Sequence, residues 1–462
     1  MQIISDICNL FWGDLFYLPL PGGGSIGISL LVALLIPTGI YFTIRTGFLP
    51  IRMMPEMLRI AVKKENGTKK GTISGIQALI ISTATRVGTG NMVGVVAAVS
   101  AGGPGAVFWM WITALIGSST AYVEATLAQQ HKQADPLYGG YRGGPAYYIH
   151  DFFSRGKQKK YQIIAVLFAL SGLLCWCGVS QVISNSVSSA FEYAFHTPPI
   201  VSTVILVVLA AVVVLRKNAT VKVLDLVVPV MAAFYFLIAV YVILTNAALL
   251  PSVMERIFEE AFGLRQMAAG GFGAALMNGV KRGLFSNEAG SGSAPCAAAA
   301  SDVSHPAKAG LMQAFGVFLD TLVICSCTAF IMLLAPEEKL EGLSGMPLLQ
   351  EAMGHHFGQA GVVFTAISLW LFSFSTFIGI LYYARGNVAY LFGDSWKAQN
   401  IYKVIALAML FVGGLAAYTF VWELGDIGVA LMTIFNLIAI VPMGGRAIKA
   451  LRDYCQLPKD QR

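Results

Sequence analysis

The sequence predicts an all-α integral membrane protein with about eleven transmembrane helices, ten of which form two inverted repeats of five. Three observations lead to this fold class. The 462 residues are 56% hydrophobic and only 12% charged, whereas soluble domains carry about 25% charged residues. The apolar residues form runs of roughly the 20 residues that a helix needs to cross a bilayer. The basic residues gather in every second connection between these runs.

The chain opens with a short amphipathic segment at residues 10–20, closed by Pro21 and three glycines. It is too short to span a bilayer, so we expect it to lie in the membrane interface. Of the runs that follow, the one at 264–287 is the least hydrophobic. The spanning helices are expected at residues 25–46, 73–101, 104–132, 161–191, 199–216, 220–247, 264–287, 306–335, 360–393, 400–421 and 425–448.

Alternate loops hold 27 of the 31 lysines and arginines, and the loops between them are acidic. Because basic loops stay in the cytoplasm, we expect the C-terminus inside the cell and, with eleven spans, the N-terminus outside. This distribution accounts for the net charge of +7, so the charge indicates no nucleic-acid partner. The basic loops are 45–70, 132–160, 216–222, 281–308, 385–403 and 446–462.

Setting the first helix aside leaves two sets of five spans. Five is odd, so the second set enters the membrane from the opposite side and forms an inverted repeat of the first. Such repeats place substrate near the midplane, between helices broken at corresponding positions. The expected domains are 1–72 (interfacial segment, extra helix and basic loop), 73–247, 264–448 and a cytoplasmic tail at 449–462.

Each set shows a break in its first helix. Residues 88–91 (GTGN) form a poor helix interior, because glycine costs about 1 kcal/mol relative to alanine and asparagine prefers a cap. Residues 270–273 (GGFG), followed by Asn278 and Gly279, are expected to break the second set in the same way. In lipid a broken helix persists only where its freed amides and carbonyls line a cavity or bind a ligand.

Four stretches resemble one family. GTGNMVGVVAAVSAGGPGAVFWMW (88–111) and GVKRGLFSNEAGSGSAP (279–295) are similar to the alanine/glycine:cation symporters, and YGGYRGGPAYYI (138–149) and LFSFSTFIGILYY (371–383) extend the similarity. The resemblance covers about residues 25 to 447. It implies a LeuT-type fold, coupling to Na⁺, and alanine or glycine as substrate. It also implies that the two breaks bind that substrate.

A zwitterionic amino acid needs partners for both ends. Helix amide ends favour its carboxylate, and unwound carbonyls accept from its ammonium group. Gln181 contacts the pocket or simply bonds a neighbouring helix, and two aromatic rings wall the pocket or anchor in lipid. The candidate substrate residues are Gly88, Thr89, Gly90, Asn91, Gln181, Gly270, Gly271, Phe272, Gly273 and Trp370.

Sodium needs about five oxygen ligands in place of its hydration shell. The resemblance of residues 371–376 implies a site made of carbonyls before the first break and of oxygens in the 360–393 helix. The alternative is that the hydroxyls bond back to their own helix, as serine and threonine often do. The candidate sodium ligands are Ala84, Val87, Phe372, Ser375 and Thr376, and Ser373 is expected on another face.

Charge inside a membrane is costly and usually functional. Arg86 and Asp320 lie at similar depth in their spans, so they are expected to form an ion pair, or Asp320 helps to hold a cation. Glu124 is the alternative partner of Arg86. Glu288 is close to a helix end and is expected to snorkel or cap.

The histidines fall in loops or at helix ends, and residues 290–293 (GSGS) lack the strand–turn–helix context of a nucleophile elbow, so an enzyme is excluded. The leading hypothesis is sodium-coupled import of alanine or glycine across the cell membrane by alternating access. A proton-coupled carrier that uses Asp320 and, third, a channel remain as alternatives. We expect no prosthetic group, lipid around the helices, and no obligate protein partner.

Overall fold

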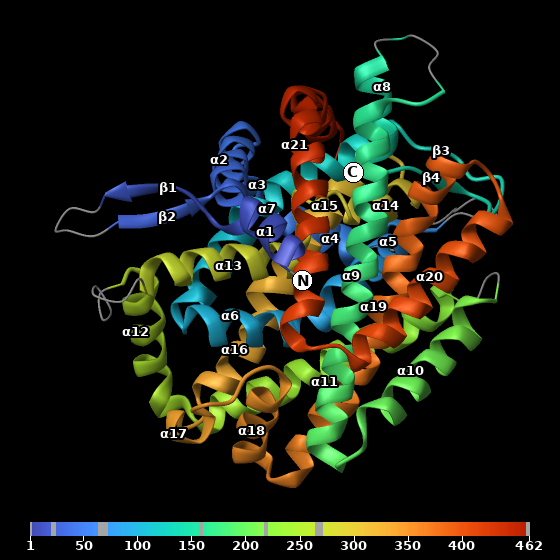
Figure 1. Cartoon of the computed structure of the whole chain (residues 1–462). Coiled ribbons are helices and arrows are strands. Elements are labelled where there is room, and N and C mark those ends of the chain that lie inside the picture. Colours follow the sequence, from blue (N-terminus) through green and yellow to red (C-terminus); the bar gives the residue numbers. More distant parts are fainter. Residues whose placement is uncertain are drawn as a thin grey trace.

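The computed structural model describes residues 2–19, 25–62, 73–154, 156, 160–216, 220–263 and 271–458. Its regular structure is almost entirely helical, as the sequence predicts (Figure 1). The described strands form two short antiparallel pairs. These are β1 (Asp14–Pro19) with β2 (Ser25–Ser29), and β3 (Gln133–Ala134) with β4 (Tyr141–Arg142).

Helices occupy every expected apolar run. In the first half they are α2 (Leu30–Arg45), α5 (Gly75–Thr85), η1 (Arg86–Gly94), α6 (Val95–Gly102), α7 (Gly105–Gln130), α9 (Ile163–Phe195), α10 (Pro199–Val214) and α11 (Thr220–Thr245). In the second half they are α13 (Gly271–Asn287), α14 (Ala294–Ala300), α15 (Pro306–Val317), η3 (Phe318–Cys325), α16 (Ser326–Leu333), α19 (Gln359–Phe392), α20 (Trp396–Leu415) and α21 (Tyr418–Gln456). Shorter helices connect them: α1 (Gln2–Trp12), α3 (Leu49–Arg52), α4 (Met54–Val62), α8 (Pro145–Ser154), η2 (Ala247–Leu249), α12 (Leu250–Ala261), α17 (Glu337–Leu340) and α18 (Met346–Phe357).

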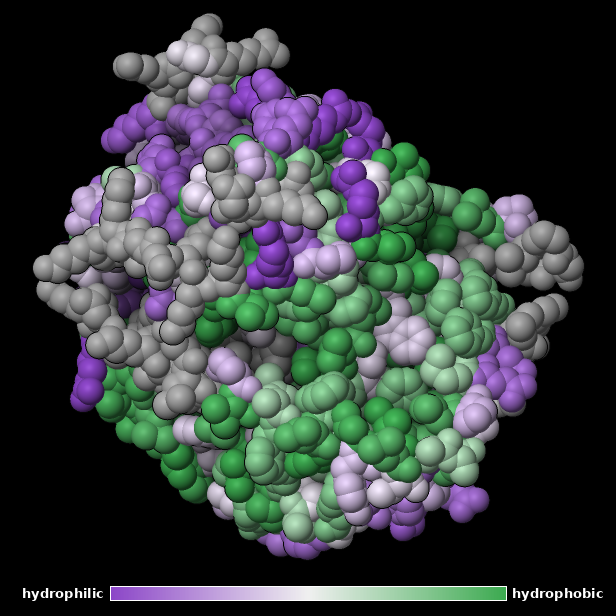
Figure 2. Space-filling model, turned by 180° about the vertical axis from the view of Figure 1, so that it is seen from behind, coloured by the Kyte–Doolittle hydropathy of each residue, from purple (hydrophilic) through white to green (hydrophobic). Residues whose placement is uncertain are grey.

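The molecule has the surface of a membrane protein. Six helical segments of the described chain are each long and apolar enough to cross a membrane: α7, α9, α15 to α16, α19, α20 and α21. Figure 2 shows a broad apolar zone on one face, with hydrophilic residues gathered above it and fewer below. α2 and α10 have only 16 residues each, and α11 from Pro229 bends by 74° into α12. The number of spans therefore stays a prediction.

The first predicted break stays helical, but its winding changes from an α-helix to a π-helix and back. α5 begins at a capping box, in which Ser74 accepts from the amide of Gln77 and Gln77 accepts from the amide of Ser74. It passes at Arg86 into η1, a π-helix of nine residues, and then into α6. π-Helical turns widen a helix and are frequent at functional sites. A second π-helix, η3, interrupts the α15–α16 segment and carries Asp320, which the sequence did not indicate.

The second broken helix is interrupted at a different place from the one predicted. Gly271 to Gly273 form the first turn of α13, which then continues without interruption to Asn287. The break lies at residues 288–293, between α13 and α14. Gly270 falls outside the described residues. Among the described residues of the stretch predicted as a break, Gly271 to Gly273 are helical, so the prediction is wrong for these three residues.

The N-terminal helix α1 packs against the helix bundle, whereas the sequence predicted a segment lying in the membrane interface. Cys8, Phe11 and Trp12 on α1 are buried, and the indole of Trp12 donates to the carbonyl oxygen of Asp426 on α21 at 3.1 Å. The β1–β2 hairpin that follows projects sideways from the helices (Figure 1). Lys281 lies over the Trp12 ring, 5.3 Å from its centre.

Candidate functional site

A polar cavity lies where the second break meets η1, α9 and α19. Its lining combines hydroxyl groups and one carboxylate with aliphatic and aromatic side chains. Such a mixture suits a small amphiphilic molecule, since convergent polar groups fix orientation and apolar walls exclude water. The lining residues are Thr89, Gly90, Cys175, Trp176, Val179, Leu284, Phe285, Glu288, Ser291, Ser293, Thr376, Ile380 and Val429.

The first break contributes Thr89 and Gly90 to this cavity, but its polar groups already have partners. The amide of Gly88 donates to Oδ1 of Asn91 at 3.0 Å, and the amide of Thr89 donates to Oγ1 of Thr376 at 3.4 Å. The amide group of Asn91 points away from the cavity, because its Nδ2 donates to Asp320. Of the four residues predicted here, the structure thus brings two to the cavity.

The second break is held open by hydrogen bonds to its backbone. Gly290 has φ +92°, and its amide donates to Oε1 of Glu124 on α7 at 3.1 Å. Asn436 on α21 donates to the carbonyl oxygen of Gly290 at 3.0 Å and to Oε2 of Glu124 at 2.8 Å. Tyr148 donates in turn to Asn436. This buried network satisfies backbone groups that an interrupted helix would otherwise leave unpaired.

Three predicted substrate residues lie elsewhere. Phe272 is 16 residues before Glu288 on a continuous helix, about 24 Å away by helical rise, and its ring packs edge-on against Trp109 at 5.8 Å. The side chain of Gln181 faces α20, where its Nε2 contacts Sδ of Met409 at 3.3 Å. Trp370 stacks on Phe374, with ring centres 5.4 Å apart. None of the three lines the cavity.

The aromatic wall comes from two residues that the sequence reasoning missed, Trp176 and Phe285. Trp176 is 2% exposed and its ring lies 6.0 Å from that of Tyr383. The signal available in the sequence was position: Trp176 lies mid-span in the same helix as Gln181, one and a half turns earlier. Phe285 lies one turn before the second break.

The candidate sodium ligands on α19 lie against η1. A Cβ atom added to Gly88 would stand 1.9 Å from Oγ1 of Thr376 and 3.2 Å from the carbonyl oxygen of Phe372, so these segments touch. The hydroxyls of Ser375 and Thr376 donate to that same carbonyl, at 2.8 and 2.9 Å. The bonding back to the helix that the alternative expects is therefore present in this structure.

The other residues predicted for the sodium site lie at the junction of α5 and η1 and on α19. The backbone of Ala84 and Val87 belongs to the end of α5 and the start of η1, next to Gly88. Ser373, expected on another face, also meets η1, since its hydroxyl lies 3.4 Å from that of Thr89. Ser373 and Thr376 are three residues apart and therefore lie on one face of α19, so the expectation that Ser373 faces elsewhere is wrong.

The buried charges are arranged differently from the prediction. Nε of Arg86 lies 3.9 Å from Oε2 of Glu288, and Nη1 of Arg86 donates to the carbonyl of Gln313 at 3.3 Å. Within the described residues no ion pair joins Arg86 to Asp320. Glu288 sits at the break with φ +59° and lines the cavity, instead of snorkelling to a surface.

Asp320 is enclosed by donors. Its Oδ1 accepts from Asn91 at 2.8 Å, and its Oδ2 accepts from Ser286 at 2.9 Å and from Thr321 at 2.7 Å. Its side chain is completely buried. This carboxylate therefore ties η1, α13 and η3 together close to the cavity.

A second polar cluster closes the molecule beside α1. Arg282 binds Asp426 through two hydrogen bonds of 3.0 and 3.2 Å, and Lys281 lies 2.8 Å from the same carboxylate. The guanidinium of Arg282 stacks over Trp422 at 3.8 Å, and Trp422 contacts Phe285, a residue of the cavity wall. Lys281 and Arg282 are thus part of α13, and their assignment to a basic loop was wrong.

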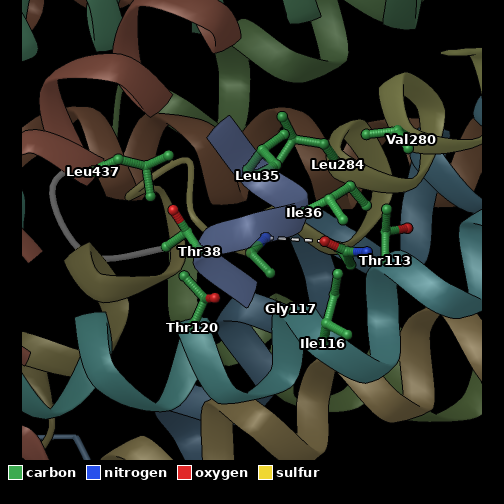
Figure 3. A pocket seen from close by; sticks show the side chains of 12 residues that line it. Leu35, Ile36, Thr38, Thr113, Ile116, Gly117, Thr120, Val280, Leu284 and Leu437 are labelled. Carbon is green, nitrogen blue, oxygen red and sulfur yellow. Dashed lines mark hydrogen bonds between the residues drawn. The ribbon is translucent and has the colours of Figure 1, made fainter. Parts of the chain in front are cut away.

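A second, mostly apolar cavity also borders the second break, and it has fewer polar groups that could bind a substrate. Figure 3 shows side chains of α2, α7, α13 and α21 converging on it, most of them aliphatic. Leu284 lines both cavities, whereas Asn287 and Ala289 line only this one. With three threonines and one amide but no charged group among its lining residues, it does not match a zwitterion.

Two interrupted helices that meet at a buried polar cavity, inside a bundle of apolar helices, define a membrane transporter with the LeuT-type fold. The fold agrees with that of MhsT, solved in complex with L-phenylalanine. The TM-score is 0.57 at 12% identity, over 84% of this chain and 97% of that one. The sequence pattern of the sodium:alanine symporter family matches residues 24–462, and the chain belongs to this family.

Curated relatives agree with this membership. The chain is 44% identical to the "Probable sodium/glutamine symporter GlnT" of Bacillus subtilis (strain 168), over 93% of this chain and 89% of that protein. It is 41% identical to the amino-acid carrier protein AlsT of the same organism, over 99% and 93%. It is 34% identical to the sodium/proton-dependent alanine carrier protein of Bacillus sp. (strain PS3), over 83% and 88%. The family is one of transporters and not of enzymes.

Proposed function

We propose that this protein imports small neutral amino acids, alanine or glycine, together with Na⁺. The observation that carries the proposal is the cavity at the second break, where hydroxyls and one carboxylate face apolar walls inside a symporter fold. The name of the family supports amino-acid–cation symport. An amino acid in such a cavity leaves water entirely, so both of its charged ends must find partners.

The cavity walls favour a small side chain. Trp176, Val179 and Phe285 form part of the wall, and Trp176 and Phe285 are large rings held by other aromatic residues. A methyl group fits beside such rings, whereas a larger side chain requires one of them to move. One relative is named for glutamine, so glutamine is the competing substrate and belongs in every competition experiment.

Sodium is proposed to bind between η1 and α19, at the carbonyls of Ala84, Val87 and Phe372 and the hydroxyls of Ser375 and Thr376. The contact of Gly88 with Thr376 supports this location. Both hydroxyls can keep donating to carbonyls while their oxygens coordinate the ion. Proton coupling through Asp320 is the second candidate, favoured by a completely buried carboxylate and by a relative named sodium/proton-dependent.

Transport is proposed to follow alternating access between two inverted repeats, residues 73–247 and 264–448. The Arg282–Asp426 pair and the rings beside it would form the barrier on the side of α1, which the charge distribution assigns to the outside. The β3–β4 region and the basic C-terminal end of α21 would then face the cytoplasm.

The test is uptake of radiolabelled alanine into proteoliposomes that hold the purified protein. Under this proposal an inward Na⁺ gradient drives saturable accumulation, and glycine competes more strongly than glutamine. Accumulation that follows a pH gradient in the absence of Na⁺ would favour the proton-coupled carrier. A conductance without saturable uptake would instead indicate a channel.

A further inference from the structure

We propose that the carboxylate of Glu288 binds the ammonium group of the transported amino acid, and so makes this site selective for α-amino acids over their uncharged analogues. The inference rests on the proposed function and names a ligand within that same cavity. It differs from the expectation that unwound carbonyls alone bind the ammonium group.

Glu288 is the acidic residue among the side chains that line the cavity. Its side chain is only 13% exposed, so the carboxylate faces an enclosed space instead of bulk water. The hydroxyl of Tyr383 donates to its Oε2 at 3.2 Å and fixes its direction. The residue stands at φ +59°, where most side chains are disfavoured, and this turns it out of the line of α13.

The two carboxylates buried closest to the second break in the described structure, Glu124 and Asp320, are committed elsewhere. Both oxygens of Glu124 accept hydrogen bonds, one from the amide of Gly290 and the other from Asn436. Both oxygens of Asp320 accept from neighbouring side chains, and the residue is completely buried. Neither lines the cavity, so Glu288 is the carboxylate that a bound amino acid meets.

Charge balance favours a cation beside Glu288. Three carboxylates, Glu124, Asp320 and Glu288, share this core with one guanidinium, that of Arg86. Arg86 lies beside Glu288, with its Nε 3.9 Å from Oε2, but one guanidinium does not match three carboxylates. An ammonium group donates up to three hydrogen bonds and brings positive charge to the part of the cavity that Glu288 lines, so a charge-assisted bond to Glu288 is favourable.

The substrate's carboxylate can turn toward the first break. Thr89 and Gly90 of η1 line the same cavity, whereas Ser291 stays next to Glu288, since its hydroxyl donates to the Glu288 carbonyl oxygen at 2.7 Å. A carboxylate directed at η1 leaves the ammonium group to Glu288 on the second break. The short distance between the two ends of an α-amino acid matches a cavity that both breaks border.

The experiment measures binding as well as transport. Wild-type protein is first shown to take up alanine with Na⁺, which tests the proposed function by itself. Glu288→Gln and Glu288→Asp are then compared by scintillation-proximity binding of radiolabelled alanine. Lactate, in which a hydroxyl replaces the ammonium group, serves as competitor. Glu124→Gln is the comparison variant: it changes an acid to an amide in the same core outside the cavity, and its loss through the second break should fall equally on alanine and lactate.

The proposal predicts that Glu288→Gln weakens alanine binding at least tenfold while lactate competition changes less than twofold, and that Glu288→Asp retains part of the affinity. The half-saturating Na⁺ concentration should stay within twofold of wild type. Equal losses for alanine and lactate, or alanine affinity within twofold of wild type, would overturn the proposal. If Glu288→Gln does not fold, Glu288→Asp decides in the same way, by whether alanine loses more than lactate.

Discussion

The two breaks solve the same problem in opposite ways. η1 keeps a continuous hydrogen-bonded helix from Arg86 to Gly94 and simply winds it more widely. The second break abandons helical structure between Asn287 and Ala294 and gives its backbone groups to Glu124 and Asn436. Glycine serves close packing in the first break and unusual backbone angles in the second. Glycine-rich sequence therefore does not by itself reveal which kind of interruption follows.

The difference assigns the two breaks different parts of the site. At η1 the polar contacts of Gly88, Thr89 and Asn91 join protein groups to one another, so these groups stabilise the packing of the break. At the second break Glu288, Ser291 and Ser293 face the cavity directly. We expect the second break to contribute more to substrate selectivity, and the first to govern sodium and packing against α19.

The largest expected effect comes from closing the contact between η1 and α19. Gly88→Ala would place a Cβ atom 1.9 Å from Oγ1 of Thr376, so the helices must separate at the proposed sodium site. Alanine uptake should fall at least a hundredfold. The double variant Gly88→Ala with Thr376→Ala should recover thermal stability without recovering sodium-dependent uptake. Near-normal uptake by Gly88→Ala alone would contradict the close contact.

A smaller loss of uptake is expected when the hydrogen-bond network that supports the second break is weakened. Glu124→Gln replaces one of two accepting oxygens by an amide NH₂, which then meets the donor of Gly290 or of Asn436, and a buried donor left unpaired costs about 1–3 kcal/mol. We expect a lower melting temperature and about tenfold weaker uptake. Tyr148→Phe, which removes only the outermost member of the network, serves as the milder comparison. Stability equal to wild type in Glu124→Gln would show that the network is not needed.

A third comparison tests the positive backbone angle φ of Gly290 in the second break. Gly290→Ala forces a side chain to φ +92°, whereas Gly290→Asn introduces a residue that tolerates positive φ better. Ala should cost about 1–2 kcal/mol of stability and Asn less, although Asn is larger. Chemical denaturation of the purified variants measures the order. If Ala is the milder change, space and not backbone angle limits this position.

The smallest effect is expected at the sodium site itself. Thr376→Val keeps the shape of the side chain but removes one oxygen, so the half-saturating Na⁺ concentration should rise severalfold while maximal uptake changes little. Ser373→Ala is the control, although its hydroxyl contacts Thr89. Uptake measured over a series of Na⁺ concentrations decides. An unchanged sodium dependence in Thr376→Val would place the ion elsewhere.

Much of the fold follows from the sequence because hydrophobic runs report burial in lipid directly. The first break was also predictable, since GTGN conflicts with helix formation inside an apolar run. The second was missed because 288–293 follows the end of a predicted span and is rich in glycine and serine, like an ordinary loop. Hydropathy alone does not separate a loop outside the membrane from a break inside the bundle.

The buried charges show a second limit. Depth in the membrane follows from counting residues, and it correctly placed Arg86 and Asp320 inside the protein. The direction of each side chain around its helix depends on winding, and both residues lie on π-helical segments. The angle per residue differs there from that of an α-helix, so a partner deduced from depth is easily the wrong one. The role of Glu288 was missed for a different reason, since its position near the end of a predicted span suggested a place at the membrane surface.

The imbalance of three carboxylates against one guanidinium also has an electrical meaning. A group that moves within the membrane field exchanges about 2.3 kcal/mol per elementary charge and 100 mV with the transmembrane voltage. With all four groups ionised, a core without cargo is negative, and Na⁺ brings it toward neutrality, whereas a zwitterionic amino acid adds no net charge. In a carrier of this kind the inside-negative voltage of a cell drives the negatively charged empty site toward the outside. The same voltage acts less on the step in which the site carries Na⁺ and substrate. Voltage steps applied without alanine should therefore evoke transient currents.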